Sequence, residues 1–205
     1  MVVIDLFRVR YTNLDFIAFI ASLITTTAPL IEVEGFKRRR RAGFSAAVYY
    51  ALMWLNFAGW SGYGRLMPDE EFHWAVRVSN SLGCVSCLYY CHQIYQYLTP
   101  KAKRKASILN TVCLILGLAL WVATYHGLTS PVEEAYATER AVGLTAALIS
   151  ILWNMTPVLV IPWLLRNPNE GVTEVLSLPV CIMYNCSSAL WCLYGLALND
   201  PFISV

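Results

Sequence analysis

Charged residues are scarce in this sequence. Lys, Arg, Asp and Glu together make up 14% of the 205 residues, whereas soluble domains carry about 25%. Hydrophobic residues reach 58%, compared with roughly 45–50% in soluble proteins. This composition excludes a large soluble domain and indicates a protein that lies in a membrane.

The sequence also lacks two marks of a secreted protein. Residues 1–13, MVVIDLFRVRYTN, do not place a basic segment before a long apolar core, so no cleavable signal peptide is predicted. The seven cysteines are odd in number and lie almost entirely inside apolar stretches, so we interpret them as small buried residues and not as a disulfide framework. We expect the first spanning helix to act as its own insertion signal.

Groups that could carry covalent chemistry are missing from the middle of the apolar stretches. No Asp or Glu lies there, so neither ion coupling nor an intramembrane enzyme is expected. Cys84, Cys87 and Cys91 do share one helix face with His92 beside them, a pattern that a metal site could use. Because small residues commonly line helix contacts in membranes, packing is the preferred interpretation. We expect no catalytic residue, metal or cofactor.

What the sequence does contain is a series of long apolar stretches. A crossing helix needs about 20 mostly apolar residues, and the strands of membrane barrels alternate in polarity and do not form such continuous runs. We therefore predict an all-α transmembrane protein on a seven-helix plan. The predicted spans are 14–33, 44–66, 72–98, 106–125, 140–165 and 174–198, and a seventh begins at 201–202 and is cut off at 205.

Lys and Arg set the orientation of these spans. Nine of the fifteen basic residues lie in the first and third connections, at 37–41 and 101–105, whereas the second and fourth connections are acidic. Because cytoplasmic loops are enriched in Lys and Arg, we predict an N-terminus outside the cytoplasm. The run at 37–41 is interpreted as a topology anchor. No nucleic-acid partner is expected, since such a patch would need a soluble context.

An internal repeat organises the chain. Residues 59–69, GWSGYGRLMPD, return as 190–200, LWCLYGLALND, with Trp, Tyr, Gly and Asp at equivalent positions. Upstream, a serine seven residues before a proline occurs at 22–29 and again at 150–157. Duplicated halves in a hydrophobic protein are typical of transporters whose binding site lies at the repeat interface.

The repeat defines the predicted domain organisation. Residues 1–13 form an extracytoplasmic N-terminus, and 14–98 form the first triple-helix repeat. Residues 99–139 hold a basic loop, a linker helix at 106–125 and an acidic loop. Residues 140–205 hold the second repeat, with its third helix only begun. Because three helices and one linker separate the copies, the repeats are parallel and related by an axis along the membrane normal.

These features resemble the SWEET sugar transporters, the MtN3/saliva family of the PQ-loop superfamily. The resemblance rests on W-x-x-Y-G at 60–64 and 191–195, a proline late in the first helix of each repeat, and an Asn early in the third helix. The family's early proline in the second helix is present as Pro179 but absent from the first repeat, which reads SAAVYY. Neither Pro29 nor Pro157 is followed by Gln, so the amino-acid branch of the superfamily fits less well.

The resemblance implies a facilitative, bidirectional sugar transporter, a uniporter for mono- or disaccharides that works by alternating access. It also implies a multi-pass protein of the plasma membrane, or else of the Golgi or another endomembrane. Its partners would be a sugar, the lipid bilayer and, as one option, a second copy in a homo-oligomer. The alternative is a PQ-loop-type membrane receptor or a carrier for another small solute such as an amino acid. A receptor for a peptide carboxylate would need basic residues in its cavity, and only Arg77 qualifies.

The predicted substrate site combines residues from both repeats. A sugar presents hydroxyl groups and an apolar ring face, so its site needs amides, hydroxyls and aromatic rings. The resemblance assigns Asn80 to the sugar contact and Trp60 and Trp191 to a bracketing pair. Asn56 and Ser187 lie one helical turn before the two tryptophans and share their faces. Four further residues are predicted to line the pocket: Ser22, Ser150, Thr25 and Trp153.

Each assignment has a plainer alternative. Tryptophans near span ends commonly lie in the interfacial belt, and serines in spans often bond to their own helix. The amide of Asn80 could simply join helices, since polar groups in a membrane are costly without a partner. Pro29, Pro157 and Pro179 are predicted to be hinges for alternating access, with static kinks as the alternative.

Two further expectations concern Arg77 and the second repeat. The guanidinium of Arg77 lies about one turn into a span, so we expect it to reach the outer surface near the acidic loop at 69–71, or else the pocket mouth. Because the second repeat has only the beginning of its third helix, the pocket residues of spans five and six are expected to face lipid or another protomer.

Overall fold

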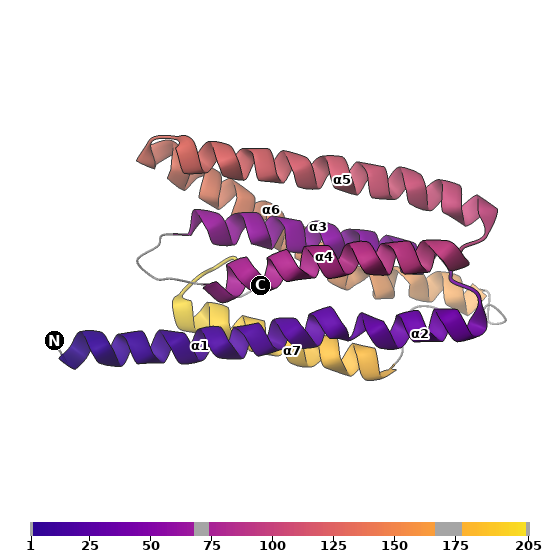
Figure 1. Ribbon diagram of the computed structural model, residues 1–205, viewed down its shortest axis with the longest axis horizontal. Coiled ribbons are helices and arrows are strands. Elements are labelled where there is room, and N and C mark those ends of the chain that lie inside the picture. Colours follow the sequence, from indigo (N-terminus) through magenta and orange to yellow (C-terminus); the bar gives the residue numbers. More distant parts are fainter. Residues whose placement is uncertain (1, 68–73, 167–177, 204–205) are drawn as a thin grey trace.

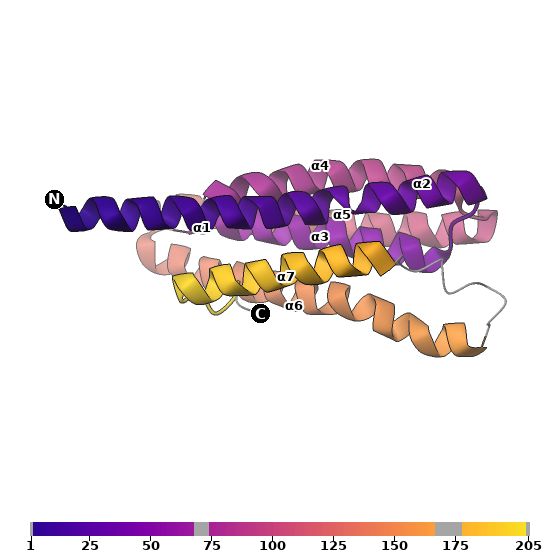
Figure 2. The same cartoon turned by 90° about the horizontal axis from the view of Figure 1, so that it is seen from below.

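A computed structural model describes residues 2–67, 74–166 and 178–203 of the chain. Helices account for nearly all of these residues and run along roughly one axis (Figures 1 and 2). The predicted all-α architecture is therefore confirmed. The helices are α1 (Val2–Thr27), α2 (Pro29–Arg39), α3 (Phe44–Leu66), α4 (Trp74–Tyr97), α5 (Pro100–Thr129), α6 (Val132–Arg166) and α7 (Leu178–Leu198).

The first predicted span is built from two helices. α1 ends at Thr27 and α2 begins at Pro29, because proline has no N–H to donate and its ring clashes with the preceding turn. The phenol of Tyr90 on α4 donates to the carbonyl of Thr26 at 2.6 Å. This bond satisfies one of the carbonyls that a helix end leaves without an intrahelical partner. A side chain of α4 therefore holds the discontinuity at Pro29.

The other two predicted hinges lie in different surroundings. Helix α6 continues through Pro157 without a break in its assignment, from Val132 to Arg166. Pro179 is the second residue of α7, a position at which the missing proline N–H would have had no intrahelical acceptor. Pro179 therefore does not interrupt the helix. The hinge role remains a prediction for all three prolines.

Two helices extend beyond the predicted spans. α1 reaches back to Val2, so the segment 1–13, predicted as an N-terminal tail, is helical from its second residue. α5 begins at Pro100 after Thr99, whose side chain caps the helix by accepting a bond from a backbone N–H three residues on. The basic loop predicted at 99–105 is thus the start of a helix. The spans predicted from hydropathy cover only the most apolar part of each of these two helices.

The predicted acidic loop is also shorter than expected. Only residues 130 and 131 separate α5 from α6. Glu133 and Glu134 lie in the first turn of α6, where the helix dipole favours negative charge. The acidic residues therefore stabilise a helix start, although their polarity alone predicted a loop. The connection at 167–173 and the acidic segment at 69–71 lie outside the described residues.

The chain is a membrane protein. Among the described residues, three helical segments are long and apolar enough to cross a bilayer: Leu14–Arg39, Pro100–Thr129 and Val132–Thr156. α3 and α4, with 23 and 24 residues, also reach across about 30 Å of hydrocarbon at roughly 1.5 Å per residue. α3 lies inside the bundle, where it packs against α4, α5 and α6.

The two repeats pack against each other reciprocally. α1 of the first repeat packs against α7 of the second, and α3 of the first packs against α6 of the second. The first helix of each repeat therefore contacts the second helix of the other, as an axis along the bundle requires. α5, the linker between the repeats, lies at the edge of the bundle against α3 and α6 (Figure 1).

Two glycines let α3 and α6 approach closely. A Cβ atom on Gly59 would lie 3.1 Å from the Cβ of Ala146, and a Cβ on Gly143 would lie 2.8 Å from a ring carbon of Tyr63. Small residues at such positions are the usual basis of close helix packing in membranes. The contact between the repeats is therefore sterically tight along these two helices.

Candidate functional site

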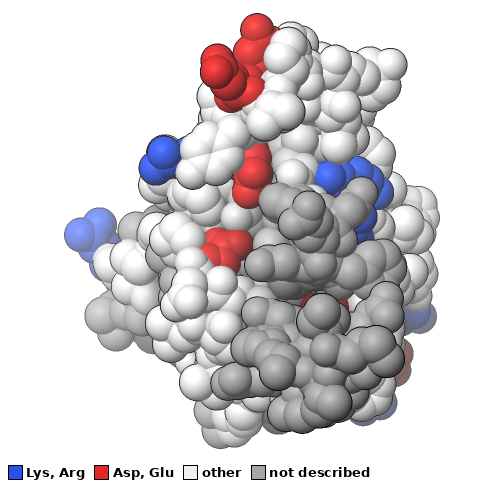
Figure 3. Space-filling view, turned by 90° about the vertical axis from the view of Figure 1, so that its left-hand side faces the viewer, with Lys and Arg blue, Asp and Glu red and all other residues white. Residues whose placement is uncertain are grey.

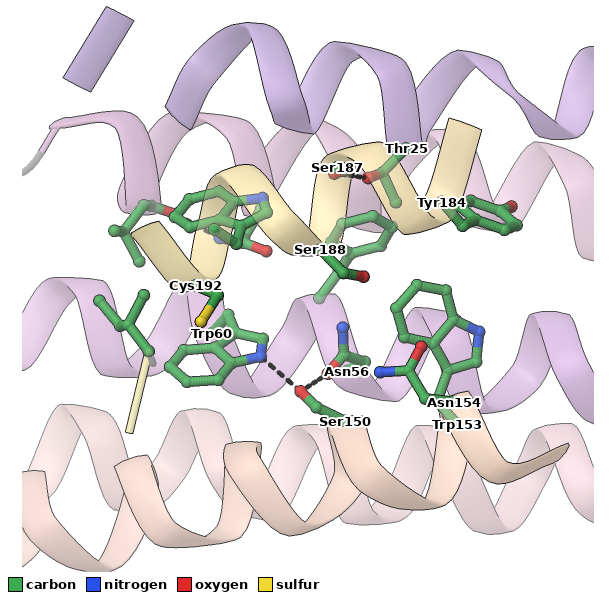
Figure 4. A pocket seen from close by; sticks show the side chains of 15 residues that line it. Thr25, Asn56, Trp60, Ser150, Trp153, Asn154, Tyr184, Ser187, Ser188 and Cys192 are labelled. Carbon is green, nitrogen blue, oxygen red and sulfur yellow. Dashed lines mark hydrogen bonds between the residues drawn. The ribbon is translucent and has the colours of Figure 1, made fainter. Parts of the chain in front are cut away.

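A cavity of about 120 Å³ lies between the two repeats (Figure 4). α1, α3 and α4 form the wall on the side of the first repeat, and α6 and α7 form the wall on the side of the second. Ile203, which follows α7 and is buried, adds to the lining. The cavity therefore occupies the interface at which the sequence places the substrate site.

The cavity brings together all the predicted substrate-binding residues except one. Ser22 is buried on α1, with 2% of its surface exposed, but it is not among the lining residues. The role of the others in binding remains a prediction. The predicted residues that line the cavity are Thr25, Asn56, Trp60, Asn80, Ser150, Trp153, Ser187 and Trp191.

Asn56, Trp60 and Ser150 form a hydrogen-bonded network across the repeat boundary. The Ser150 hydroxyl donates to the side-chain oxygen of Asn56 at 2.6 Å and accepts from the Trp60 indole N–H at 2.8 Å (Figure 4). The bond orients the Asn56 carboxamide and leaves its NH₂ group for another acceptor. This network fixes the indole of Trp60 and joins α3 to α6.

Thr25 and Ser187 join α1 to α7 in a similar way. Their hydroxyl oxygens lie 2.5 Å apart, and both are within bonding distance of the Ala21 carbonyl, at 3.2 and 2.8 Å respectively. Ser187 is 2% exposed. The two hydroxyls are therefore engaged inside the protein, which leaves them little capacity to bind a ligand.

Asn80 retains hydrogen-bonding capacity. One of its amide hydrogens is donated to the Val76 carbonyl, one turn back on α4, at 2.8 Å. Within the described part of the chain, its side-chain oxygen and second amide hydrogen have no hydrogen-bond partner. A carboxamide in this state can both accept from and donate to a ligand hydroxyl.

Sequence reasoning missed two polar residues of the cavity, Asn154 and Ser188. Each directly follows a predicted pocket residue, Trp153 on α6 and Ser187 on α7. Figure 4 shows both side chains at the cavity. Consecutive residues in a helix point about 100° apart. The sequence therefore did not predict that two consecutive residues would both line the cavity. The structure also adds less polar lining from Phe57, Val76, Tyr184, Cys192 and Ile203.

The pocket residues of the second repeat face the first repeat. Trp153 is 7% exposed and Ser187 is 2% exposed. Trp153 packs against Tyr49 of α3, with ring centroids 5.6 Å apart. The expectation that these residues would meet lipid or another protomer is wrong, because α1 and α3 of the first repeat cover them.

Hydrogen bonds between the repeats lie beyond the cavity toward the C-terminal ends of α3 and α7. Tyr63, three residues after Trp60, donates to the Asp200 carboxylate at 2.7 Å. Tyr194, its counterpart in the second repeat, donates to the carboxylate of Asp15 on α1. Each tyrosine of the duplicated W-x-x-Y-G motif therefore bonds to an acidic residue of the other repeat.

An aromatic cluster lies on the opposite side of the cavity. Tyr49, Trp153 and Tyr184 contact one another pairwise, with centroid separations of 5.6, 5.7 and 5.9 Å. All three are buried, and they come from α3, α6 and α7. Aromatic contact between the two repeats is thus concentrated here, where the first repeat has SAAVYY in place of the early proline.

Arg77 lies in the first turn of α4, and its guanidinium reaches the C-terminal end of α3 and does not line the cavity. Its guanidinium donates to the carbonyls of Gly64 at 2.6 Å and Met67 at 3.1 Å. A cation at this position satisfies carbonyls of the last turn and interacts favourably with the helix dipole. The pocket-mouth alternative is therefore not supported, and the loop at 69–71 lies outside the described residues.

The described lining contains no Asp, Glu, Lys, Arg or His side chain. It combines carboxamides, hydroxyls and indole rings. Such a surface suits an uncharged ligand with many hydroxyl groups, because each hydroxyl can donate and accept while a ring face packs on an indole. It offers no opposite charge to a carboxylate or an ammonium group.

Comparisons with known proteins find sequence relatives among sugar transporters. The family model described as "Sugar efflux transporter for intercellular exchange" matches residues 140–205. The human sugar transporter SWEET1 is 30% identical over 151 residues, which cover 74% of this chain and 62% of the human protein. SWEET1 of Danio rerio is 25% identical over 189 residues, which cover 92% of this chain and 80% of the fish protein.

The fold has a solved counterpart. The structure of a eukaryotic SWEET transporter at 3.7 Å resolution superimposes with a TM-score of 0.69 and 20% sequence identity. The match covers 97% of this chain and 89% of that one. The present chain spans 62% of the length of the human relative that it matches.

Proposed function

We propose that this chain, which is similar in sequence to the SWEET sugar transporters of the MtN3/saliva family, is a member of that family and carries mono- or disaccharides across a membrane down their gradient. The observation that carries the proposal is the cavity at the repeat interface. It offers the free amides of Asn56 and Asn80 beside the indoles of Trp60 and Trp191, and its described lining has no charged side chain. We propose the plasma membrane as its location, with an endomembrane such as the Golgi as the alternative.

The proposed mechanism is alternating access. The two repeats contact each other on both sides of the cavity, through Tyr63–Asp200 and Tyr194–Asp15 on one side and through the aromatic cluster on the other. For the cavity to open toward one side of the membrane, the contacts between the repeats on that side must separate while the contacts on the other side stay in place. Hydrogen bonds and ring contacts of this kind are each worth about 0.5–1.5 kcal/mol, so a bound substrate can shift the balance between two closed arrangements.

The proposed orientation places the N-terminus outside the cytoplasm. The connections that carry most of the Lys and Arg lie at one end of the bundle (Figure 1), and the backbone N–H of Ala42 bonds to the Tyr97 carbonyl at 3.0 Å between them. The opposite end displays acidic as well as basic side chains (Figure 3). A basic end belongs in the cytoplasm.

A carrier of amino acids and a receptor for a peptide carboxylate are the alternatives. Both need charged groups to pair with their ligand. Arg77 caps α3, and the described lining contains no charged side chain. The structure therefore favours an uncharged substrate. Transport without ion coupling is part of the proposal, since no carboxylate lines the described cavity.

Uptake of radiolabelled hexoses by cells without carriers of their own tests the proposal. The wild-type chain should take up a hexose, excess unlabelled sugar should compete, and excess amino acid should not. Asn80→Ala should abolish uptake while surface expression stays intact, because substrate hydroxyls lose a buried partner worth roughly 1–3 kcal/mol. If only amino acids compete for uptake, the result would instead support a carrier of amino acids.

A further inference from the structure

The polar side chains that the two repeats bring to the cavity differ in how far their hydrogen bonds are already made within the protein. In the first repeat, the carboxamides of Asn56 and Asn80 both keep atoms without a hydrogen-bond partner among the described residues. On the side of the second repeat, the hydroxyls of Ser150 and Ser187 are engaged in bonds across the boundary. The predicted serines of the second repeat therefore cannot donate to a ligand hydroxyl without giving up a hydrogen bond within the protein.

Asn154 on α6 is a polar residue of the second repeat that is available to bind a ligand. It lines the cavity next to Trp153, and Figure 4 shows its side chain at the cavity on the same side as Asn56. Its carboxamide makes no hydrogen bond within the described part of the chain. Ser188 on α7 also lines the cavity, and its hydroxyl has no hydrogen-bond partner among the described residues.

An unpaired amide in a membrane helix needs a reason. Polar groups facing hydrocarbon without a partner are costly, and serine or threonine can return its hydroxyl to its own helix, as Thr145 and Thr156 do on α6. Asn154 makes no such bond in the described chain. A position at a cavity, where a ligand or water reaches the amide, removes this cost.

We propose that Asn154 is a specificity-determining residue that binds a substrate hydroxyl from the second repeat, with Ser188 as a neighbouring partner. This inference rests on the proposed sugar transport and adds a contact from the second repeat to the predicted site. Asn56 and Asn80 contribute polar groups from the first repeat, and Asn154 contributes one from the second. A carboxamide is suited to this task because it donates and accepts, as a sugar hydroxyl does.

The chemical consequence is recognition of one hydroxyl by one residue. Removal of that hydroxyl from the sugar and removal of the Asn154 amide delete the same hydrogen bond, so the two losses are not additive. Removal of any other hydroxyl leaves the bond intact. A merely structural asparagine would instead affect all sugars alike.

The experiment measures uptake of glucose and of a set of monodeoxyglucoses by the full chain in liposomes. Asn154→Leu keeps the side-chain size and deletes the hydrogen bond, and Asn110→Leu on α5, away from the cavity, is the matched control. Wild type and control should take up one deoxyglucose about three- to tenfold less well than glucose. Asn154→Leu should take up glucose and that deoxyglucose equally, while it still discriminates against the others.

Other outcomes separate the two proposals. If the wild type transports glucose and Asn154→Leu keeps every discrimination ratio, or loses uptake of all sugars by the same factor, the assignment of Asn154 is wrong and sugar transport stands. If the wild type transports no sugar, the proposed function fails and this inference fails with it. Should Asn154→Leu not reach the membrane, Asn154→Ala is measured in the same way, with the same expected result.

Discussion

At the scale of single residues, the same side-chain type has different tasks at different places in this protein. Ser150 bonds to both Asn56 and Trp60, whereas the hydroxyl of Ser188, also at the cavity, has no hydrogen-bond partner in the part of the chain that the structure describes. Asn56 is oriented by a partner from the other repeat, and Asn80 by its own helix. The bonds that join the repeats determine which polar groups remain available to a substrate.

Tyr63 should control access to the cavity from its predicted outer side. Tyr63→Phe removes the hydroxyl that donates to Asp200 at 2.7 Å, a bond worth about 0.5–1.5 kcal/mol. We expect this side to open more often, so that the thiol of Cys192, which lines the cavity, reacts about two- to tenfold faster with a membrane-impermeant reagent. The measurement uses intact cells and a variant in which the other cysteines are replaced.

Tyr136→Phe is the matched control for this prediction. Tyr136 lies on α6 and is 59% exposed, so loss of its hydroxyl should not change the rate at Cys192. An excess of transported sugar should slow the reaction in both variants, because the substrate occupies the cavity. Equal rates in Tyr63→Phe and the wild type would show that this bond does not hold the side closed.

Trp153 should restrict the size of the substrate. Its indole is 7% exposed and fills space between Tyr49 and Tyr184 beside the cavity. We expect the wild type to prefer hexoses to disaccharides, and Trp153→Val to extend uptake to sucrose, because removal of the indole enlarges the cavity. Trp121→Val, which removes an indole from the exposed face of α5, should leave the preference unchanged. A wild type that already prefers sucrose would contradict the steric argument.

At the scale of helices, the first repeat has a discontinuity that the sequence shows only as a proline. α1 and α2 meet at Pro29, and Tyr90 of α4 holds a carbonyl beside the break. Helix α6, the equivalent helix of the second repeat, runs through Pro157 as one element. Two prolines in equivalent sequence positions thus have unequal effects on their helices.

The crossing of α3 and α6 should be sensitive to added volume. A Cβ on Gly143 would lie 2.8 Å from the Tyr63 ring and 2.9 Å from Phe202. Because overpacking costs typically 1–3 kcal/mol, we expect Gly143→Val to lower the unfolding temperature in detergent by roughly 2–10 °C. Gly35→Ala on α2 is the control, since its nearest neighbour is the flexible side chain of Arg39 at 3.4 Å. Equal melting temperatures for both variants would show that the crossing can relax.

At the scale of the whole molecule, the clustering of the basic connections supports the proposed orientation. Each basic connection is next to the other at one end of the bundle, tied by the bond between Ala42 and Tyr97. An accessible tag at the N-terminus should be stained on intact cells, or be lumenal in vesicles, whereas a tag inserted at Arg39 should be stained only after permeabilisation. Staining of a tag at Arg39 on intact cells would contradict both the orientation and the count of spans.

The sequence by itself determined much of the architecture. Apolar stretches of about 20 residues predict spanning helices, because a backbone in lipid must satisfy its own hydrogen bonds. The duplicated W-x-x-Y-G motif then predicted two parallel repeats and drew attention to Trp60 and Trp191, which do line the cavity. These conclusions depend on local composition and on spacing, which a sequence displays directly.

Only the tertiary structure decided how the polar groups are used. Asn154 and Ser188 reach the cavity, Ser22 does not, and the serines predicted to bind substrate join the repeats instead. Arg77 caps α3, and the acidic residues that suggested a loop begin a helix. A helix period gives the direction of a side chain, but its partner belongs to another helix, and the crossing of two helices depends on contacts between residues far apart in the sequence.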